Sequence, residues 1–121
     1  MSLLQFRKDD VLSSDEVAAA LKEAGLPFSA GPSGGATPGV EHVDRLLVGD
    51  EAQRVELHLL RFENAQDAIN QSGRYVTQLR ASRPEAPLGR FNYGRTLVLA
   101  VGLAPAADVN GLIERLTALR A

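Results

Sequence analysis

The stretch from Thr96 to Val101 reads TLVLAV and is apolar at every position after the first. A strand with one face in water alternates apolar and polar residues, whereas a strand covered on both faces reads as a continuous apolar run. The run therefore predicts a central β-strand that is buried on both sides. Such a strand needs amphipathic segments elsewhere in the chain to cover it.

Three segments have the apolar spacing of amphipathic helices, at about residues 14–24, 64–80 and 105–120. Ser13 and Glu16 have the spacing of a capping box before the first helix, and Gly25 suits the left-handed position after it. Asn64 is expected to cap the second helix, and Pro105 suits the first position of the third. These signals predict three helices with defined beginnings.

Two further strands joined by a short turn are predicted between the first two helices, with residues 43–48 as one arm, 49–51 as the turn and 53–62 as the other arm. In the second arm, Val55, Leu57 and Leu59 point to one face. Residues 27–39 and 82–94 are rich in turn-forming residues, and both are expected to be flexible loops.

Together these elements predict a single α+β domain over residues 1–121. The expected architecture is a two-layer sandwich, in which a three- to four-stranded, mainly antiparallel sheet carries its helices on one face. The order strand, helix, strand, helix in the second half also gives the fold ferredoxin-like features. If strands 53–62 and 96–102 are parallel neighbours, the connection between them should be right-handed.

Composition excludes several classes of chemistry. The chain has no cysteine, which rules out disulfides, thiolate nucleophiles and cysteine-based metal sites. It has no apolar run of the roughly 18–20 residues that span a bilayer, and charged residues interrupt the N-terminal segment where a signal peptide would be apolar. We expect a cytoplasmic protein without a cofactor, although an exported form with a trimmed signal stays open.

The segment VELHLLRFENAQDA, from Val55 to Ala68, joins a strand that ends in an aromatic residue and an acid to a helix that opens with small and acidic residues. Together with the strand at 95–101 and the last amphipathic helix, it resembles small bacterial α+β domains, some of which are lipoproteins. The resemblance covers about the last two thirds of the chain. It implies the fold and no activity, and the chain lacks the acylated cysteine of the lipoprotein members.

The two histidines, His42 and His58, suggest one possible reactive site. With Glu56 close in sequence, they could form a small metal or acid–base site if the hairpin brings them to one face, because imidazole and carboxylate groups are common ligands of divalent metals. The chain has no HxxxH or HExxH spacing, however, and no serine in a GxSxG turn. We therefore assign no catalytic residue and no metal ligand.

The charges are distributed unevenly along the chain. Residues 41–67 carry seven acids against three arginines, whereas residues 74–95 carry five arginines against Glu85 alone. Within the basic segment, arginines flank two aromatic residues, a pattern that could bind an anion or stack on bases. The candidate ligand-binding residues are Arg74, Arg90, Phe91, Tyr93 and Arg95.

The alternative interpretation of this segment is structural, with the aromatic rings covering the sheet and the arginines pairing with the acidic hairpin. A sequence pI near 5.6 argues against nucleic acid as a partner. We expect a binding or interaction module without catalytic activity that forms a homodimer through its sheet or a helix face. Two alternatives stay open, an anion or nucleic-acid binder through residues 74–95 and a small metal-dependent enzyme that uses His42 and His58.

Overall fold

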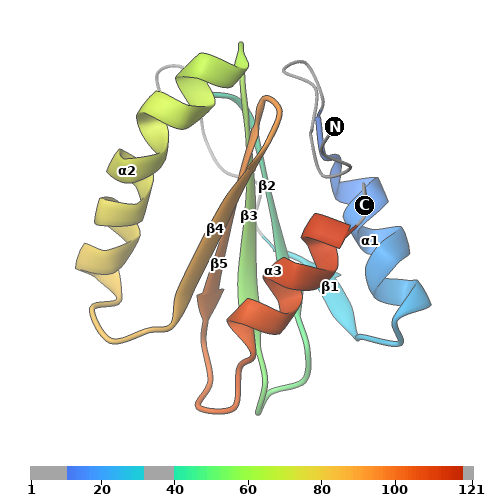
Figure 1. The fold of residues 1–121 in the computed structure, drawn as a ribbon. Coiled ribbons are helices and arrows are strands. Elements are labelled where there is room, and N and C mark those ends of the chain that lie inside the picture. Colours follow the sequence, from blue (N-terminus) through green and yellow to red (C-terminus); the bar gives the residue numbers. More distant parts are fainter. Residues whose placement is uncertain (1–10, 32–39, 119–121) are drawn as a thin grey trace.

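The computed structural model describes residues 11–31 and 40–118 (Figure 1). Its elements in chain order are α1 (Ser14–Glu23), β1 (Phe28–Ala30), β2 (Val40–Val48), β3 (Val55–Phe62), α2 (Ala65–Ser82), β4 (Leu88–Tyr93), β5 (Thr96–Gly102) and α3 (Val109–Thr117). No helix within these ranges is both long and apolar enough to cross a membrane.

The strands form one sheet in the order β1-β2-β3-β5-β4, and every neighbouring pair is antiparallel. The predicted α+β class and the antiparallel sheet are confirmed, with five strands in place of three or four. Strand β5 lies between β3 and β4, and all of its residues are buried. The apolar run at residues 96–101 is therefore an interior strand covered on both faces, as its sequence predicts.

The helices lie on both faces of the sheet, which corrects the expectation that one face would carry them all. In Figure 1, α2 covers one face while α1 and α3 cover the other. The reason is the apolar run itself, because its side chains point alternately to opposite faces. Val98 and Ala100 belong to the core under α1 and α3, whereas Leu97 and Leu99 belong to the core under α2.

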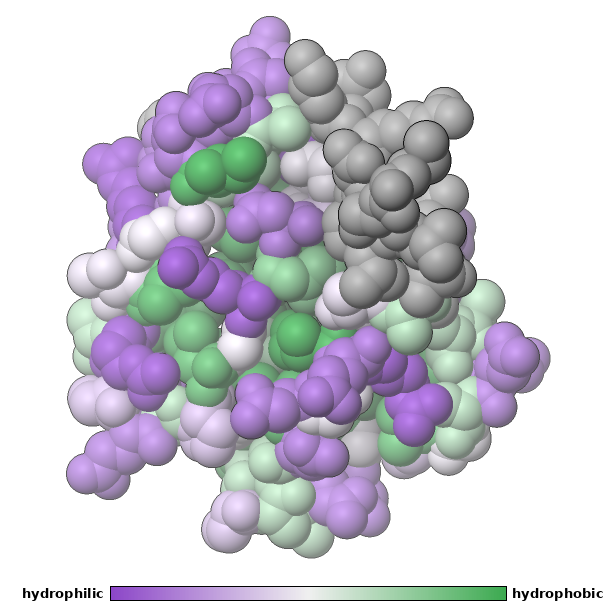
Figure 2. Space-filling model, viewed as in Figure 1, coloured by the Kyte–Doolittle hydropathy of each residue, from purple (hydrophilic) through white to green (hydrophobic). Residues whose placement is uncertain are grey.

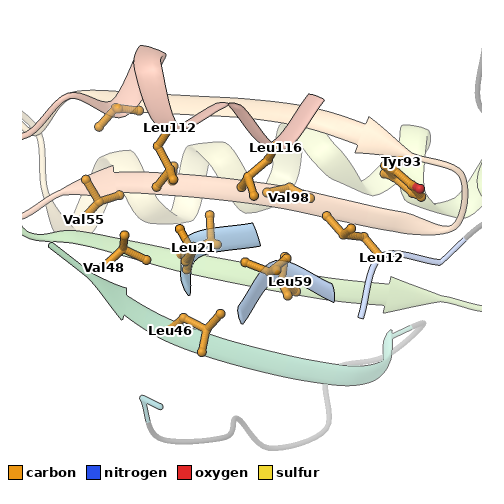
Figure 3. Packing of buried hydrophobic residues seen from close by; sticks show 14 residues of the cluster. Leu12, Leu21, Leu46, Val48, Val55, Leu59, Tyr93, Val98, Leu112 and Leu116 are labelled. Carbon is orange, nitrogen blue, oxygen red and sulfur yellow. The ribbon is translucent and has the colours of Figure 1, made fainter. Parts of the chain in front are cut away.

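The core under α1 and α3 is the larger of the two, and Figure 3 shows how its side chains meet. Leu21 from α1, Leu112 and Leu116 from α3, and Val55 and Leu59 from β3 converge between the helices and the sheet. On the opposite face, the core comprises Val40, Val43, Leu60, Phe62, Ala68, Leu97 and Leu99. Two separate cores thus hold the helices against one sheet.

Strands β3 and β5 are antiparallel neighbours, so the condition for a right-handed parallel connection between them is not met. Because β3 and β4 are each antiparallel to β5, they run in the same direction, with β5 between them. The segment β3-α2-β4 is therefore a split β-α-β unit, which is the ferredoxin-like feature of this fold.

Residues 88–93 form an edge strand, which corrects the prediction of a flexible loop over residues 82–94. The strand is easily missed because Gly89 adds no side chain to an alternating pattern. The close packing of α3 explains the glycine, since a Cβ atom there would lie 2.9 Å from Val109 Cγ1. Figure 2 shows this edge, where hydrophobic residues between α2 and α3 are interrupted by hydrophilic ones. Interruption of the apolar pattern hides such a strand from sequence analysis.

Two smaller expectations also change. The predicted loop at residues 27–39 contains the short strand β1, and its residues 32–39 lie outside the described ranges. Helix α3 begins at Val109 rather than near Pro105. Its N-cap residue is Asp108, whose carboxylate accepts a hydrogen bond from the Gly111 N–H at 2.9 Å, and this bond places the start of the helix four residues later.

The caps of the other two helices agree with the sequence. The Ser13 hydroxyl accepts a hydrogen bond from the Glu16 N–H at 3.2 Å, and the Asn64 side chain accepts one from the Asp67 N–H at 2.8 Å. Gly25 has a φ of 74°, the left-handed conformation expected after α1. Helix α2 therefore begins where the sequence predicts, and its start fixes which of its residues face the sheet.

Candidate ligand pocket beside helix α2

The α2-facing side of the sheet contains a polar cluster formed by the buried His58 and the partly buried Arg45 and Glu56. In the β2–β3 ladder Arg45 is directly opposite His58, so both side chains point to the same face. Glu56 lies two residues before His58 on β3 and therefore shares that face. The Arg45 Nε lies 3.3 Å from His58 Nδ1, and the Glu56 Oε1 lies 2.7 Å from His58 Nε2.

These contacts define the hydrogen bonds of the imidazole. A carboxylate oxygen can only accept, so His58 Nε2–H donates to Glu56. A guanidinium can only donate, so His58 Nδ1 accepts from the Arg45 Nε–H. Both ring nitrogens are therefore engaged, and the arrangement requires the neutral imidazole with its proton on Nε2.

The electrostatic environment favours the same neutral form. Burial lowers the pKa of His58 below its ordinary value of 6.5, because the charged imidazolium loses its hydration. The Glu56 carboxylate opposes this shift, while the positive charges of Arg45 and Arg83 add to it. The net effect is a lowered pKa, so His58 is uncharged at neutral pH.

A pocket of about 250 Å³ lies over this cluster. Strands β2, β3 and β5 form its floor, and α2 forms its wall. The lining residues are Val43, Arg45, His58, Leu60, Tyr75, Gln78, Leu79, Ser82 and Leu99. Apolar and aromatic side chains share the lining with four polar ones, Arg45, His58, Gln78 and Ser82.

The two histidines do not meet. His42 is opposite Arg61 in the ladder, and it lines a different hollow with Leu12 and Leu59, on the α1 side of the sheet. His58 lines the pocket on the α2 side. Within the described ranges, no group of three or more histidine or acidic side chains could hold a metal ion. The geometry therefore does not support a site built from both histidines.

His42 forms its own local pair. Its Nε2 lies 2.9 Å from Asp44 Oδ1, two residues along the same strand. The pair is on the opposite face of β2 from Arg45, so the hairpin separates the residues that the sequence suggested as one acid–base group.

The basic segment is dispersed over the structure. Arg74 contacts Gln71 on the exposed side of α2, Arg90 donates to the Ser72 hydroxyl at 3.1 Å, and Arg95 donates to the Glu63 carbonyl oxygen at 3.1 Å. Each of these guanidinium groups thus bonds a different partner, and none of those three partners is an acidic side chain.

The two aromatic residues of the segment belong to the core. Tyr93 is completely buried on the α3 side of the sheet, and Phe91 packs against the same core. Figure 3 shows the Tyr93 ring among these core side chains. The Tyr93 ring is therefore not placed to stack on a base at the surface, whereas the Phe91 ring is partly exposed. The structural interpretation of the aromatic pair is the one that the packing supports.

Sequence analysis named only His58 of the pocket residues; those it missed include Arg45 and the α2 residues Tyr75, Gln78, Leu79 and Ser82. Arg45 could have been found from the hairpin register, because pairing Leu46 with Leu57 places it opposite His58. Nothing in the sequence pattern showed that α2 would cover this face. The α2 side of the pocket could be recognised only after the two helix layers were known.

Comparisons of the chain with protein-family models, with curated proteins and with solved structures gave no match. The function must therefore be inferred from the pocket and its neighbouring groups.

Proposed function

We propose that this protein is a binding module without catalytic activity, and that the pocket beside α2 takes up a small molecule. The observation that carries the proposal is the hydrogen bonding of His58 to both Arg45 and Glu56. Arg45 and His58, which is hydrogen-bonded to Glu56, line a hollow whose other side chains are mostly apolar. Polar groups held in place among apolar side chains can orient a small ligand.

The hydrogen bonds of His58 argue against catalysis. In a nucleophile–histidine–acid arrangement, one ring nitrogen donates to the acid and the other accepts from the hydroxyl or thiol that attacks. Here the acid is Glu56, but the second partner is the guanidinium of Arg45, which is not a nucleophile. The same guanidinium places positive charge at the nitrogen lone pair that a metal would need.

The experiment is a ligand screen by two-dimensional ¹H–¹⁵N NMR on the full chain. A ligand of the pocket should shift the amide signals of pocket residues such as Val43, His58 and Leu79. The Gln78→Trp variant places a large side chain at the exposed wall and should abolish these shifts. The Gln66→Trp variant, at an exposed position of the same helix away from the pocket, serves as its control.

The proposal is contradicted if no compound of a diverse fragment library perturbs the pocket, or if Gln78→Trp and Gln66→Trp bind equally well. Turnover in a broad hydrolase assay that is lost in His58→Ala would also contradict it.

Self-association and a cytoplasmic location stay predictions. The sheet ends in two edge strands, and β4 with six residues is longer than β1 with three. A second copy could pair with the longer edge, because among the described residues no strand pairs with the outer side of β4. Sedimentation equilibrium tests this prediction, and a monomer at high protein concentration contradicts it.

A further inference from the structure

We propose that the β4 edge of the sheet binds an extended segment of another protein as an added strand, and that this segment alternates acidic and apolar residues. Strand addition to a sheet edge is a common mode of peptide recognition. The inference concerns a different surface from the pocket beside α2. It follows from the backbone of β4, from the arginines on one of its faces and from the apolar side chains on the other.

The backbone of β4 directs hydrogen-bonding groups away from the sheet at alternate residues. The Gly102 N–H donates to the Pro87 carbonyl oxygen at 2.8 Å, so pairing with β5 begins just before β4, and the register continues through β4 without a shift. In an antiparallel pair every second residue bonds with its neighbour. Leu88, Arg90 and Asn92 therefore direct their N–H and C=O groups outward. In the described part of the sheet, no strand lies on that side.

The α2-facing side of this edge is basic. Arg90 is exposed and stands opposite Leu99, so it shares the face that α2 covers. Its guanidinium donates to the Ser72 hydroxyl at 3.1 Å, and Arg80 donates to the Ala86 carbonyl oxygen at 2.6 Å, near the start of β4. Neither arginine forms an ion pair with another described residue. Both positive charges can therefore pair with carboxylates of a partner.

The α3-facing side of the same edge is apolar. Phe91 is partly exposed there, and so is Ile113 of α3, whose Cγ1 would lie 3.0 Å from a Cβ atom on Gly89. Figure 2 shows hydrophobic residues beside hydrophilic ones along this edge. An added strand sends successive side chains to opposite faces, so one set meets Arg90 and the other meets Phe91 and Ile113. A strand that alternates acidic and apolar residues matches both faces.

The charges distinguish this partner from a second copy of the chain. A symmetric pair of β4 strands joined at their middle would place the two Arg90 side chains on one face, close to the two-fold axis. Like charges at opposing positions of neighbouring strands are destabilising, whereas opposite charges are stabilising. An acidic strand avoids the repulsion and neutralises the arginines. Self-pairing is thus the competing use of this edge.

The probe is a synthetic peptide of alternating glutamate and valine, as long as β4 and capped at both ends, with a lysine–valine peptide as its control. In ¹H–¹⁵N NMR spectra of the full chain, the glutamate peptide should shift the amide signals of Leu88, Arg90 and Asn92. It should also slow hydrogen exchange at these amides, because new bonds between strands protect them. The lysine peptide should bind about tenfold or more weakly, because several attractive charge pairs become repulsive.

Methylation of the peptide nitrogens separates strand addition from charge attraction alone. Residues directly opposite each other in an antiparallel ladder share a face and, at these positions, exchange their backbone bonds. The glutamates therefore stand opposite Leu88, Arg90 and Asn92, and their N–H groups point at β4. N-methylation of the glutamates should abolish binding. N-methylation of the valines, whose N–H groups point away from β4, should preserve it.

A charge-removing variant tests the protein side of the contact. Arg90→Gln should reduce the affinity for the glutamate peptide about twofold to fivefold, the effect of an exposed ion pair. Arg74→Gln is the matched control with the same change of charge. Arg74 is exposed two residues after Ser72 on α2, so it does not share the side of the helix that meets Arg90.

Each result either supports or overturns the inference. It is overturned if the glutamate peptide does not bind, if the lysine peptide binds as tightly, or if methylation of the glutamates and of the valines has the same effect. Equal affinities of Arg90→Gln and Arg74→Gln also overturn it, as do peptide-induced shifts confined to the pocket beside α2. If the chain alone is a dimer in sedimentation equilibrium and its Arg90 and Asn92 amides are already protected, a second copy occupies the edge instead.

Discussion

Arg45 on β2 donates its Nε–H to His58 Nδ1 on β3, across a pair of residues that stand directly opposite each other in the antiparallel ladder. The contact joins a permanent cation to a histidine residue that is only 7% exposed. It is possible only while the imidazole is neutral, because a protonated Nδ1 has no lone pair to accept the bond. The stability of the fold and the electrostatics of the pocket therefore both depend on the protonation state of His58.

Folding stability should fall when the solution becomes mildly acidic. The pKa of His58 in the folded protein lies below its ordinary value of 6.5, so the unfolded chain takes up a proton at a higher pH than the folded chain does. The contribution of His58 is fully present above 6.5 and is lost as the pH falls towards the folded value. Urea unfolding at about pH 7.5 and about pH 5 measures this loss.

The variant His58→Gln should lose less stability than the wild type between these two pH values, because the titrating group is gone. His42→Gln is the matched control, since His42 is half-exposed and lies on the other face of the sheet. If His58→Gln and the wild type lose the same stability between these pH values, the lowered pKa of His58 does not contribute to the loss of stability in acid.

Two glycine-to-alanine substitutions should have opposite effects. Gly73 is exposed within α2, and a Cβ atom there has no neighbour within 4 Å. Gly73→Ala should therefore stabilise the fold by about 0.5–1 kcal/mol, because alanine has the higher helix propensity. A Cβ atom on Gly89 would lie 2.9 Å from Val109 Cγ1 and 3.0 Å from Ile113 Cγ1.

Gly89→Ala should therefore destabilise the fold by about 1–3 kcal/mol, the typical effect of overpacking. Equilibrium unfolding in urea gives both values. An equal effect of the two substitutions would contradict the close packing of α3 on β4.

Tyr93→Ala should act on stability rather than on binding. The Tyr93 side chain is completely buried in the core under α1 and α3, and removal of a large buried aromatic group costs about 3–5 kcal/mol. Denaturant unfolding measures the effect. A variant that keeps wild-type stability and loses affinity for a ligand would restore Tyr93 as a surface binding residue.

Much of the secondary structure could be predicted because its signals are local. The Ser13 and Asn64 caps mark the beginnings of α1 and α2 through bonds to residues three positions later. The apolar run in β5 predicts a strand covered on both faces. In each case the physical cause acts over a few neighbouring residues, so the sequence of one segment is enough to predict the element.

The strand β4 and the site needed the tertiary structure. The sequence around Gly89 lacks the alternating apolar pattern of a strand. The segment becomes a strand because it pairs with β5 and packs under α3. His42 and His58 are close in the hairpin sequence, but the strand register sends them to opposite faces and brings Arg45 to His58 instead. Contacts between segments far apart in sequence depend on register and on helix placement.

The amino-acid sequence was thus sufficient to establish an α+β chain with capped amphipathic helices and a buried central strand, because short-range hydrogen bonds and apolar periodicity produce these features. The placement of α2 alone on one face, and the pocket that it forms over Arg45 and His58, were decided by the three-dimensional fold. Both faces of β5 are apolar, so its sequence indicates that each face must be covered. It does not specify which helix covers which face.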